Sequence, residues 1–119
     1  MTLNFFVEIL HNDNIPVLRV KGEIDVYSCP QLTTSLKSIM EKGYSDFVLN
    51  LEDIDYIDST GLGSIAYAAR HITPNNGTIN IVCTKPQIRR IFEVSGLDKK
   101  NITLFKQEEL AVSAFTSKD

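Results

Sequence analysis

A short, almost continuous run of apolar residues does most to limit how this chain can fold. The run is Phe47-Val48-Leu49-Asn50-Leu51, and the segment from Ile79 to Cys83 repeats the pattern later in the chain. Strands of this kind are buried on both faces, as in a sheet that is flanked by helices. We therefore predict that both segments are strands of one central sheet.

Each of these strands is followed by a segment with helical periodicity. The apolar residues at helical spacing are Leu62, Ile65, Ala66 and Ala69 in the first segment, and Ile88, Ile91 and Phe92 in the second. An earlier helix is predicted from about residue 29 to 42. Ser28 and Gln31 have the spacing of a capping box at its start, and Gly43 fits a C-terminal cap at its end.

Weaker patterns predict the remaining elements. Apolar stretches at 5–10 and 15–20 flank a polar turn, which indicates a β-hairpin. The other expected elements are a loop from Gly22 to Tyr27, an acidic loop from Glu52 to Asp58, a last strand from Ile102 to Phe105 and a helix from Glu108 to Phe115.

A hairpin followed by repeated strand-helix units predicts an α/β fold with a mostly parallel central sheet and about four flanking helices. We expect residues 1–119 to form a single domain. Its ordered core is expected at about 3–115, and 116–119 is expected to be a loose tail.

Composition excludes several classes of protein. The formal net charge of -3 disfavours binding to nucleic acid phosphates. No signal-peptide pattern and no apolar run of membrane-spanning length is present, so we expect a cytoplasmic protein with no membrane partner. Cys29 and Cys83 lie in no metal or redox motif, so we expect reduced thiols and neither a metal nor a cofactor.

The segment Asp58-Ser59-Thr60-Gly61 is the main candidate functional site. Two hydroxyls stand at the N-terminus of a predicted helix, where free N–H groups and the helix dipole favour an anion. Ser59 or Asp58 also fits an ordinary helix cap, and the two roles are compatible. Acidic residues surround the segment in the two preceding loops: Glu23, Asp25, Asp53, Asp55 and Asp58. If these loops meet at one sheet edge, phosphorylation would raise the repulsion and desolvation cost in an interface there.

Two motifs resemble the signatures of STAS-domain anti-sigma factor antagonists, also called anti-anti-sigma factors. They are Gly22-Glu23-Ile24-Asp25-Val26-Tyr27-Ser28 and Asp58-Ser59-Thr60-Gly61-Leu62-Gly63, and the likeness extends through Leu49-Asn50-Leu51 and Arg90 to Leu97. The resemblance implies that Ser59 is phosphorylated by a serine kinase that is itself the anti-sigma factor. It also implies that the unphosphorylated chain binds this kinase and releases a sigma factor, and that a PP2C-type phosphatase resets the switch.

The resemblance further implies a partner-binding face made of Glu23, Asp25, Tyr27, Asp58, Thr60, Gly61 and Leu62. Asp25 is expected to contact the kinase or to position the serine loop, and Gly61 to permit a close backbone approach. Leu62 fits an interface anchor and a core residue equally well. Cys29, where the family commonly has smaller residues, lies outside both motifs.

Other functions fit the sequence less well. Gly61-Leu62-Gly63-Ser64-Ile65-Ala66 matches a dinucleotide fingerprint, but residues 78–84 lack the acid that this motif requires. A serine hydrolase is disfavoured because Gly-x-Ser-x-Gly is absent and the two histidines, His11 and His71, lie in a turn and near a helix end. We therefore predict no catalytic residues and no enzyme activity. An adaptor subunit of another phospho-signalling or transporter assembly remains the alternative function.

Overall fold

Five strands form a single sheet in the order β1-β2-β3-β4-β5 in this computed structural model, which describes residues 5–116. The strands are β1 (Phe6–Asn12), β2 (Ile15–Ile24), β3 (Asp46–Ile57), β4 (Thr78–Val82) and β5 (Ile102–Phe105). β1 and β2 are an antiparallel hairpin, and the other neighbours are parallel. The sheet confirms the predicted α/β fold class.

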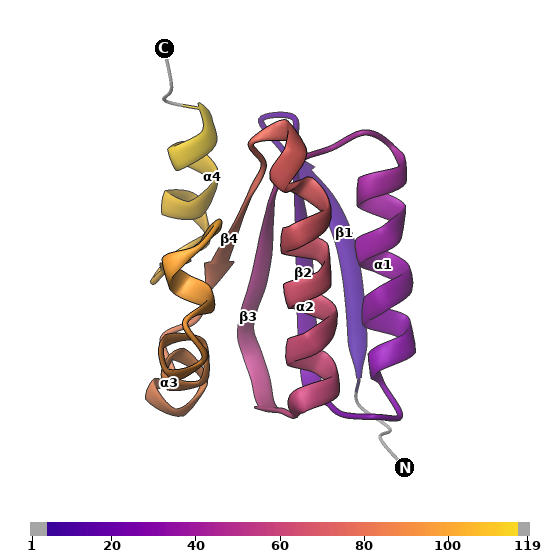
Figure 1. Ribbon diagram of the computed structural model, residues 1–119, viewed down its shortest axis with the longest axis vertical. Coiled ribbons are helices and arrows are strands. Elements are labelled where there is room, and N and C mark those ends of the chain that lie inside the picture. Colours follow the sequence, from indigo (N-terminus) through magenta and orange to yellow (C-terminus); the bar gives the residue numbers. More distant parts are fainter. Residues whose placement is uncertain (1–4, 117–119) are drawn as a thin grey trace.

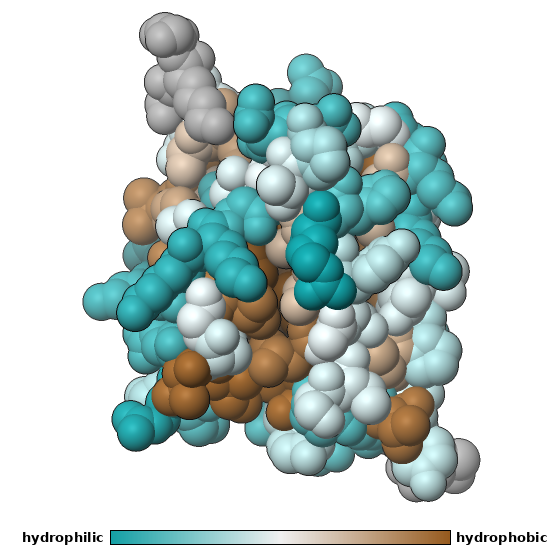
Figure 2. All heavy atoms as spheres, in the orientation of Figure 1, coloured by the Kyte–Doolittle hydropathy of each residue, from teal (hydrophilic) through white to brown (hydrophobic). Residues whose placement is uncertain are grey.

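Four helices cover the two faces of the sheet (Figure 1). They are α1 (Cys29–Glu41), α2 (Ser59–Ile72), α3 (Pro86–Ser95) and α4 (Glu108–Thr116), and two short 3-10 helices, η1 (Thr73–Asn75) and η2 (Leu97–Lys99), follow α2 and α3. No helix within residues 5–116 is long and apolar enough to span a bilayer. In the same orientation, apolar surface is exposed between α2 and α3 (Figure 2).

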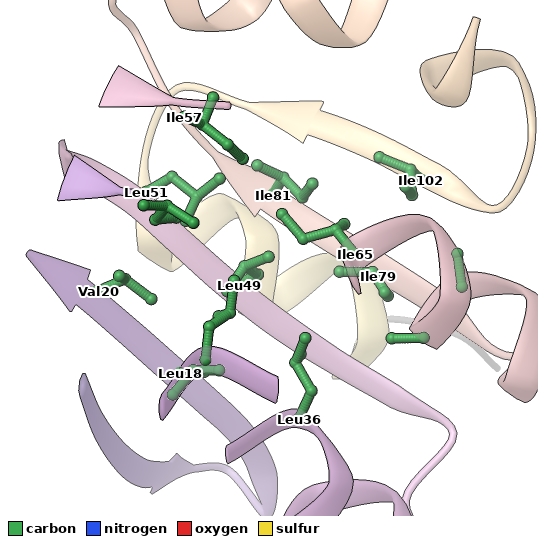
Figure 3. Packing of buried hydrophobic residues seen from close by; sticks show 14 of the residues in the cluster. Leu18, Val20, Leu36, Leu49, Leu51, Ile57, Ile65, Ile79, Ile81 and Ile102 are labelled. Atoms are coloured by element: carbon green, nitrogen blue, oxygen red, sulfur yellow. The ribbon is translucent and has the colours of Figure 1, made fainter. Parts of the chain in front are cut away.

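Alternate side chains of the strands enter two separate apolar clusters. Leu18, Leu49 and Ile81 pack beneath α1, α2 and α3 in the larger cluster, where Leu36 and Ile65 come from the first two helices (Figure 3). The neighbouring strand residues Val17, Val48 and Val82 face the opposite way and pack against Ala111 and Val112 of α4. Successive strand residues point to opposite faces, so burial of both sets explains the unbroken apolar runs in the sequence.

β2 and β3 are longer than the sequence predicts. The predicted loops at Gly22 to Tyr27 and Glu52 to Asp58 are wrong in part, because β2 continues to Ile24 and β3 to Ile57. The two extensions pair with each other from Lys21 and Asp53 onward, with register shifts on the way. The extensions are rich in acidic residues, so their sequence resembles that of loops. One face is nevertheless apolar, and Ile24, Ile54 and Ile57 are buried on it.

α4 is attached to the sheet by a polar contact as well as by its apolar face. The Glu108 carboxylate accepts two hydrogen bonds from Arg19 on β2, at 2.9 and 2.7 Å, and a third from Asn50 on β3 at 2.8 Å. These bonds, the Arg19 bond first, lower the pKa of Glu108. The helix ends at Thr116, so the tail predicted at 116–119 is wrong at Thr116, and residues 117–119 lie outside the described part of the chain.

Glu108→Gln should lower the free energy of unfolding by about 1 kcal/mol at pH 7, because it removes a charge-assisted pair that is partly exposed on the Arg19 side. Since the pKa of Glu108 is lowered by folding, this contribution is present above about pH 4.3, the ordinary value for Glu. It should be lost as the pH falls through the folded-state value. Urea denaturation at pH 7 and pH 3 measures both effects.

Glu109→Gln is the matched control, because Glu109 is the exposed neighbour in the same first turn and has no ion pair among residues 5–116. The same loss of stability in both variants at pH 7 would contradict a specific role for Glu108.

Candidate functional site

The carboxyl ends of β2 and β3 bring the two sequence motifs together. The backbone N–H of Asp58, directly after β3, donates a 3.0 Å hydrogen bond to the carbonyl of Ile24 at the end of β2. This bond joins the β2–α1 loop to the start of α2 (Figure 1). The two loops therefore meet at one edge of the sheet, as the strand order requires.

Asp58 is the N-cap of α2. Its Oδ1 accepts hydrogen bonds from the backbone N–H groups of Thr60 and Gly61, at 3.0 and 3.1 Å. The Thr60 hydroxyl donates to the same oxygen at 2.6 Å. The Thr60 hydroxyl bond is the main reason that the pKa of Asp58 is lowered. Of the two capping candidates in the sequence, the structure selects Asp58.

The Ser59 side chain is left free by this arrangement. Ser59 is the first residue of α2 and is exposed, and its hydroxyl forms no hydrogen bond with any residue from 5 to 116. Thr60 is also exposed, but its hydroxyl is committed to Asp58. The two adjacent hydroxyls therefore differ in their availability to an incoming reagent.

The first-turn N–H groups expected to attract an anion are already bonded. Thr60 and Gly61 donate them to the Asp58 carboxylate, which carries a full negative charge at neutral pH. A phosphate on Ser59 would thus stand beside a carboxylate and lack these two donors. The environment raises the cost of burying such a group.

Asp25 shapes the neighbouring loop. Its Oδ1 accepts hydrogen bonds at 3.0 Å from the backbone N–H groups of both Tyr27 and Ser28. The Ser28 hydroxyl accepts from the Asp25 N–H and donates to the Glu23 carbonyl, so the predicted capping box of α1 does not form. As a result, Tyr27 projects outward with 82% of its surface exposed.

Leu62 is part of the core and also reaches the surface. It is half-buried against the larger apolar cluster, and it also lines a groove with Ile91 and Val94 of α3. Val94 is 75% exposed, and Arg90 also lines the groove. The apolar spacing of α3 in the sequence does not single out Val94, because this residue lies off the buried face of the helix.

Comparison with known proteins decides the family. The model of the STAS domain matches residues 6–111 of this chain. The chain belongs to the STAS-domain family. An anti-sigma-B factor antagonist of Staphylococcus aureus (strain NCTC 8325 / PS 47) is 34% identical over 95 residues, which cover 80% of this chain and 88% of the relative. The Staphylococcus epidermidis protein of the same name is 32% identical over the same shares of both chains.

Solved structures show the same STAS fold. An anti-sigma factor antagonist from Mycobacterium paratuberculosis superposes with a TM-score of 0.85 at 24% identity, covering 93% of both chains. The Bacillus cell fate determinant SpoIIAA in its phosphorylated form gives a TM-score of 0.72 at 23% identity, covering 93% of this chain and 98% of that one.

Cys29 joins α1 to α2 next to the second STAS motif. Its sulfur lies 3.1 Å from the Ser64 hydroxyl and 3.5 Å from the Thr60 carbonyl, so Cys29, which lies outside both motifs in the sequence, contacts the second motif in the structure. Both cysteines are free and buried, and burial raises the pKa of Cys83 to about 11. Within residues 5–116, no group of three His, Cys, Asp or Glu side chains is placed to hold a metal ion.

Gly61 lets the first turn of α2 lie against the strand extensions. A Cβ at this position would overlap Ile24 Cγ2 and would lie 3.0 Å from Ile57 Cγ1. We therefore expect Gly61→Ala to lower the free energy of unfolding by about 1–3 kcal/mol, the usual cost of overpacking. Chemical denaturation measures this change.

Gly63→Ala provides the control within the same helix. A Cβ there meets nothing within 4 Å, so the variant should gain up to about 1 kcal/mol from the higher helix propensity of alanine. A Gly61→Ala chain as stable as Gly63→Ala would refute the close-approach argument.

Proposed function

We propose that this STAS domain is an anti-sigma factor antagonist that is switched by phosphorylation of Ser59. In its unphosphorylated form it binds an anti-sigma factor that is also a serine kinase, and it thereby releases a sigma factor for transcription. Phosphorylation ends this binding, and a PP2C-type phosphatase restores the active form. The names of the staphylococcal relatives support the regulatory class.

The free hydroxyl of Ser59 is the observation that carries the proposal. A kinase must align the acceptor oxygen with the transferred phosphoryl group, and positioning supplies much of the catalysis. Ser59 Oγ is exposed and has no hydrogen-bond partner among residues 5–116. Phosphorylation of Thr60 would first require loss of its 2.6 Å bond to Asp58 and weakening of the α2 cap.

The switch acts through charge at a site that already carries a carboxylate. Phosphorylation adds about -1.5 to -2 charges at neutral pH. The new group would lie next to the Asp58 carboxylate, which already accepts the hydrogen bonds of the Thr60 and Gly61 N–H groups. It would also lie one helical turn from the apolar groove at Leu62. Removing such a phosphate from water under a partner is costly unless the partner supplies new donors, so the complex should dissociate.

The proposed partner-binding face has apolar anchors on both sides of Ser59. Tyr27 and Val26 project from the β2–α1 loop, with 82% and 58% of their surfaces exposed. Leu62 and Val94 lie on the other side, in the groove between α2 and α3. Exposed apolar side chains of this size mark interaction surfaces, and buried aromatic anchors often dominate binding. Glu23 and Asp25 complete the face, where they favour a basic partner surface.

We expect incubation with the anti-sigma kinase of the same organism and ATP to add one phosphate to Ser59. Mass spectrometry of peptides locates the modified residue. Ser59→Ala should abolish incorporation, whereas Thr60→Val, which keeps the side-chain volume, should retain it. Phosphate on Thr60 in the unmodified chain would refute the assignment.

Affinity for the same kinase should show whether added negative charge at position 59, and not loss of the hydroxyl, weakens the complex. Ser59→Ala should bind about as tightly as the unmodified chain, and Ser59→Asp should bind about tenfold more weakly because it brings a second carboxylate beside Asp58. Calorimetry measures both affinities. Equal affinities for the two variants would contradict an electrostatic switch.

Capture of binding partners by Ser59→Ala tests the alternative function. A transporter captured in place of a kinase would favour the adaptor function.

Val94→Ala tests the groove separately. Val94 is largely exposed, so its loss should weaken kinase binding by about tenfold and leave folding unchanged. Leu110→Ala on α4 is the control, because Leu110 is 51% exposed and lies outside the proposed face. If the two variants bind equally well, the groove is not part of the interface.

A further inference from the structure

A second cavity lies farther along α2, away from Ser59. It has a volume of about 310 Å³ and separates the C-terminal half of α2 from η2 and the start of β5. Its apolar walls are formed by Ala66, Ala69, Leu97 and Ile102. The cavity adjoins the apolar surface seen between α2 and the α3 segment (Figure 2).

The charge at this cavity has one sign. Arg70 from α2 and Lys100 after η2 line it, and neither forms an ion pair with any residue between 5 and 116. No carboxylate from the described part of the chain lines the cavity. This contrasts with the acidic loops around Ser59 and with the net charge of -3 of the whole chain.

The far end of the cavity is held rigid by Asn101. Its Nδ2 donates to the carbonyls of Ala69 and Gly77, at 2.7 and 3.0 Å, and approaches the Thr73 hydroxyl at 3.3 Å. These contacts join the residue before β5 to α2 and to the residue before β4. A preformed apolar space with a few polar groups at its rim is the usual form of a small-molecule site.

We propose that this cavity binds a small anionic amphiphile, such as a medium-chain carboxylate, with its apolar part between α2 and η2. The volume corresponds to about ten non-hydrogen atoms, since each water in the liquid occupies about 30 Å³. The anionic group lies between Arg70 and Lys100. The C-terminal end of α2 carries a partial charge of only about -0.5, so the two full positive charges outweigh it.

This site is distinct from the switch and does not depend on the function proposed for Ser59. Leu62 and the Ser59 loop belong to the other end of α2, and none of their residues lines the cavity. Ser59→Ala should therefore bind the amphiphile as the unmodified chain does.

Sodium octanoate, which has ten non-hydrogen atoms, is the probe. Titration into the ¹⁵N-labelled full chain should give saturable shifts of the amide signals of Ala66, Ala69, Leu97 and Ile102, with a dissociation constant of about 1 mM. Octylammonium has a chain of the same length and the opposite charge, and it should bind about tenfold more weakly. Shifts that do not saturate, or equal binding of the two probes, would overturn the proposal.

Three variants separate the contribution of the two cations to octanoate binding from that of the apolar space. Arg70→Gln combined with Lys100→Gln should weaken octanoate binding about tenfold and leave binding of neutral 1-octanol unchanged. Ala66→Leu fills the cavity and should abolish binding of both molecules. Lys99→Gln removes a neighbouring exposed charge that does not line the cavity, and octanoate binding should be retained. Thermal unfolding confirms that each variant is folded.

The double charge variant decides the outcome even if Ala66→Leu is unstable, because both of its substitutions are on the surface. Octanoate binding that is unchanged in the double variant refutes the site. Sedimentation with phosphatidylglycerol vesicles gives the other test: binding to vesicles that is lost in the double variant would assign these cations to a membrane surface and overturn the small-molecule proposal.

Discussion

The carboxylate of Asp58 fixes where α2 begins and which hydroxyl is left free. One oxygen accepts from two backbone N–H groups and the Thr60 hydroxyl, while the backbone N–H of the same residue bonds to Ile24 at the end of β2. The helix start, the neighbouring loop and the orientation of Ser59 are thus set by a single residue. The N-cap therefore determines that the Thr60 hydroxyl is bonded and that the Ser59 hydroxyl is available for reaction.

Periodicity predicts the elements of this fold well where burial is uniform. The apolar run at 47–51 lies within β3, and the run at 79–83 lies within β4 except for Cys83, which follows the strand. Helical spacing locates α2 and α3 within a few residues. Periodicity fails to predict strands in which only one face is buried and most of the other residues are polar, as in the extensions of β2 and β3. It also fails for the capping box predicted at the start of α1, because the Ser28 hydroxyl bonds within its own loop.

The motifs in the sequence place the candidate site, and the three-dimensional contacts distinguish its members. The family resemblance points to Ser59, but the local sequence does not show that the Ser59 hydroxyl is free and the Thr60 hydroxyl is not, because that difference comes from the hydrogen bond of Thr60 to Asp58. The apolar groove at Leu62 and Val94 needs two helices that are distant in sequence. The cavity lined by Arg70 and Lys100 likewise depends on packing between segments that no local pattern connects.

The strand order of the sheet follows the order of the chain, and this has a consequence for synthesis on the ribosome. Each strand pairs with the one made just before it, so every new strand adds to an edge that already exists. The parallel pairs join residues that are far apart in the chain, such as Leu18 and Leu49, so each new strand must wait for its crossover helix and leaves an edge exposed meanwhile. α4 is the exception: Glu108 on this helix bonds to Arg19 on β2, and the apolar surface of Val17 and Val48 stays uncovered until α4 has been made.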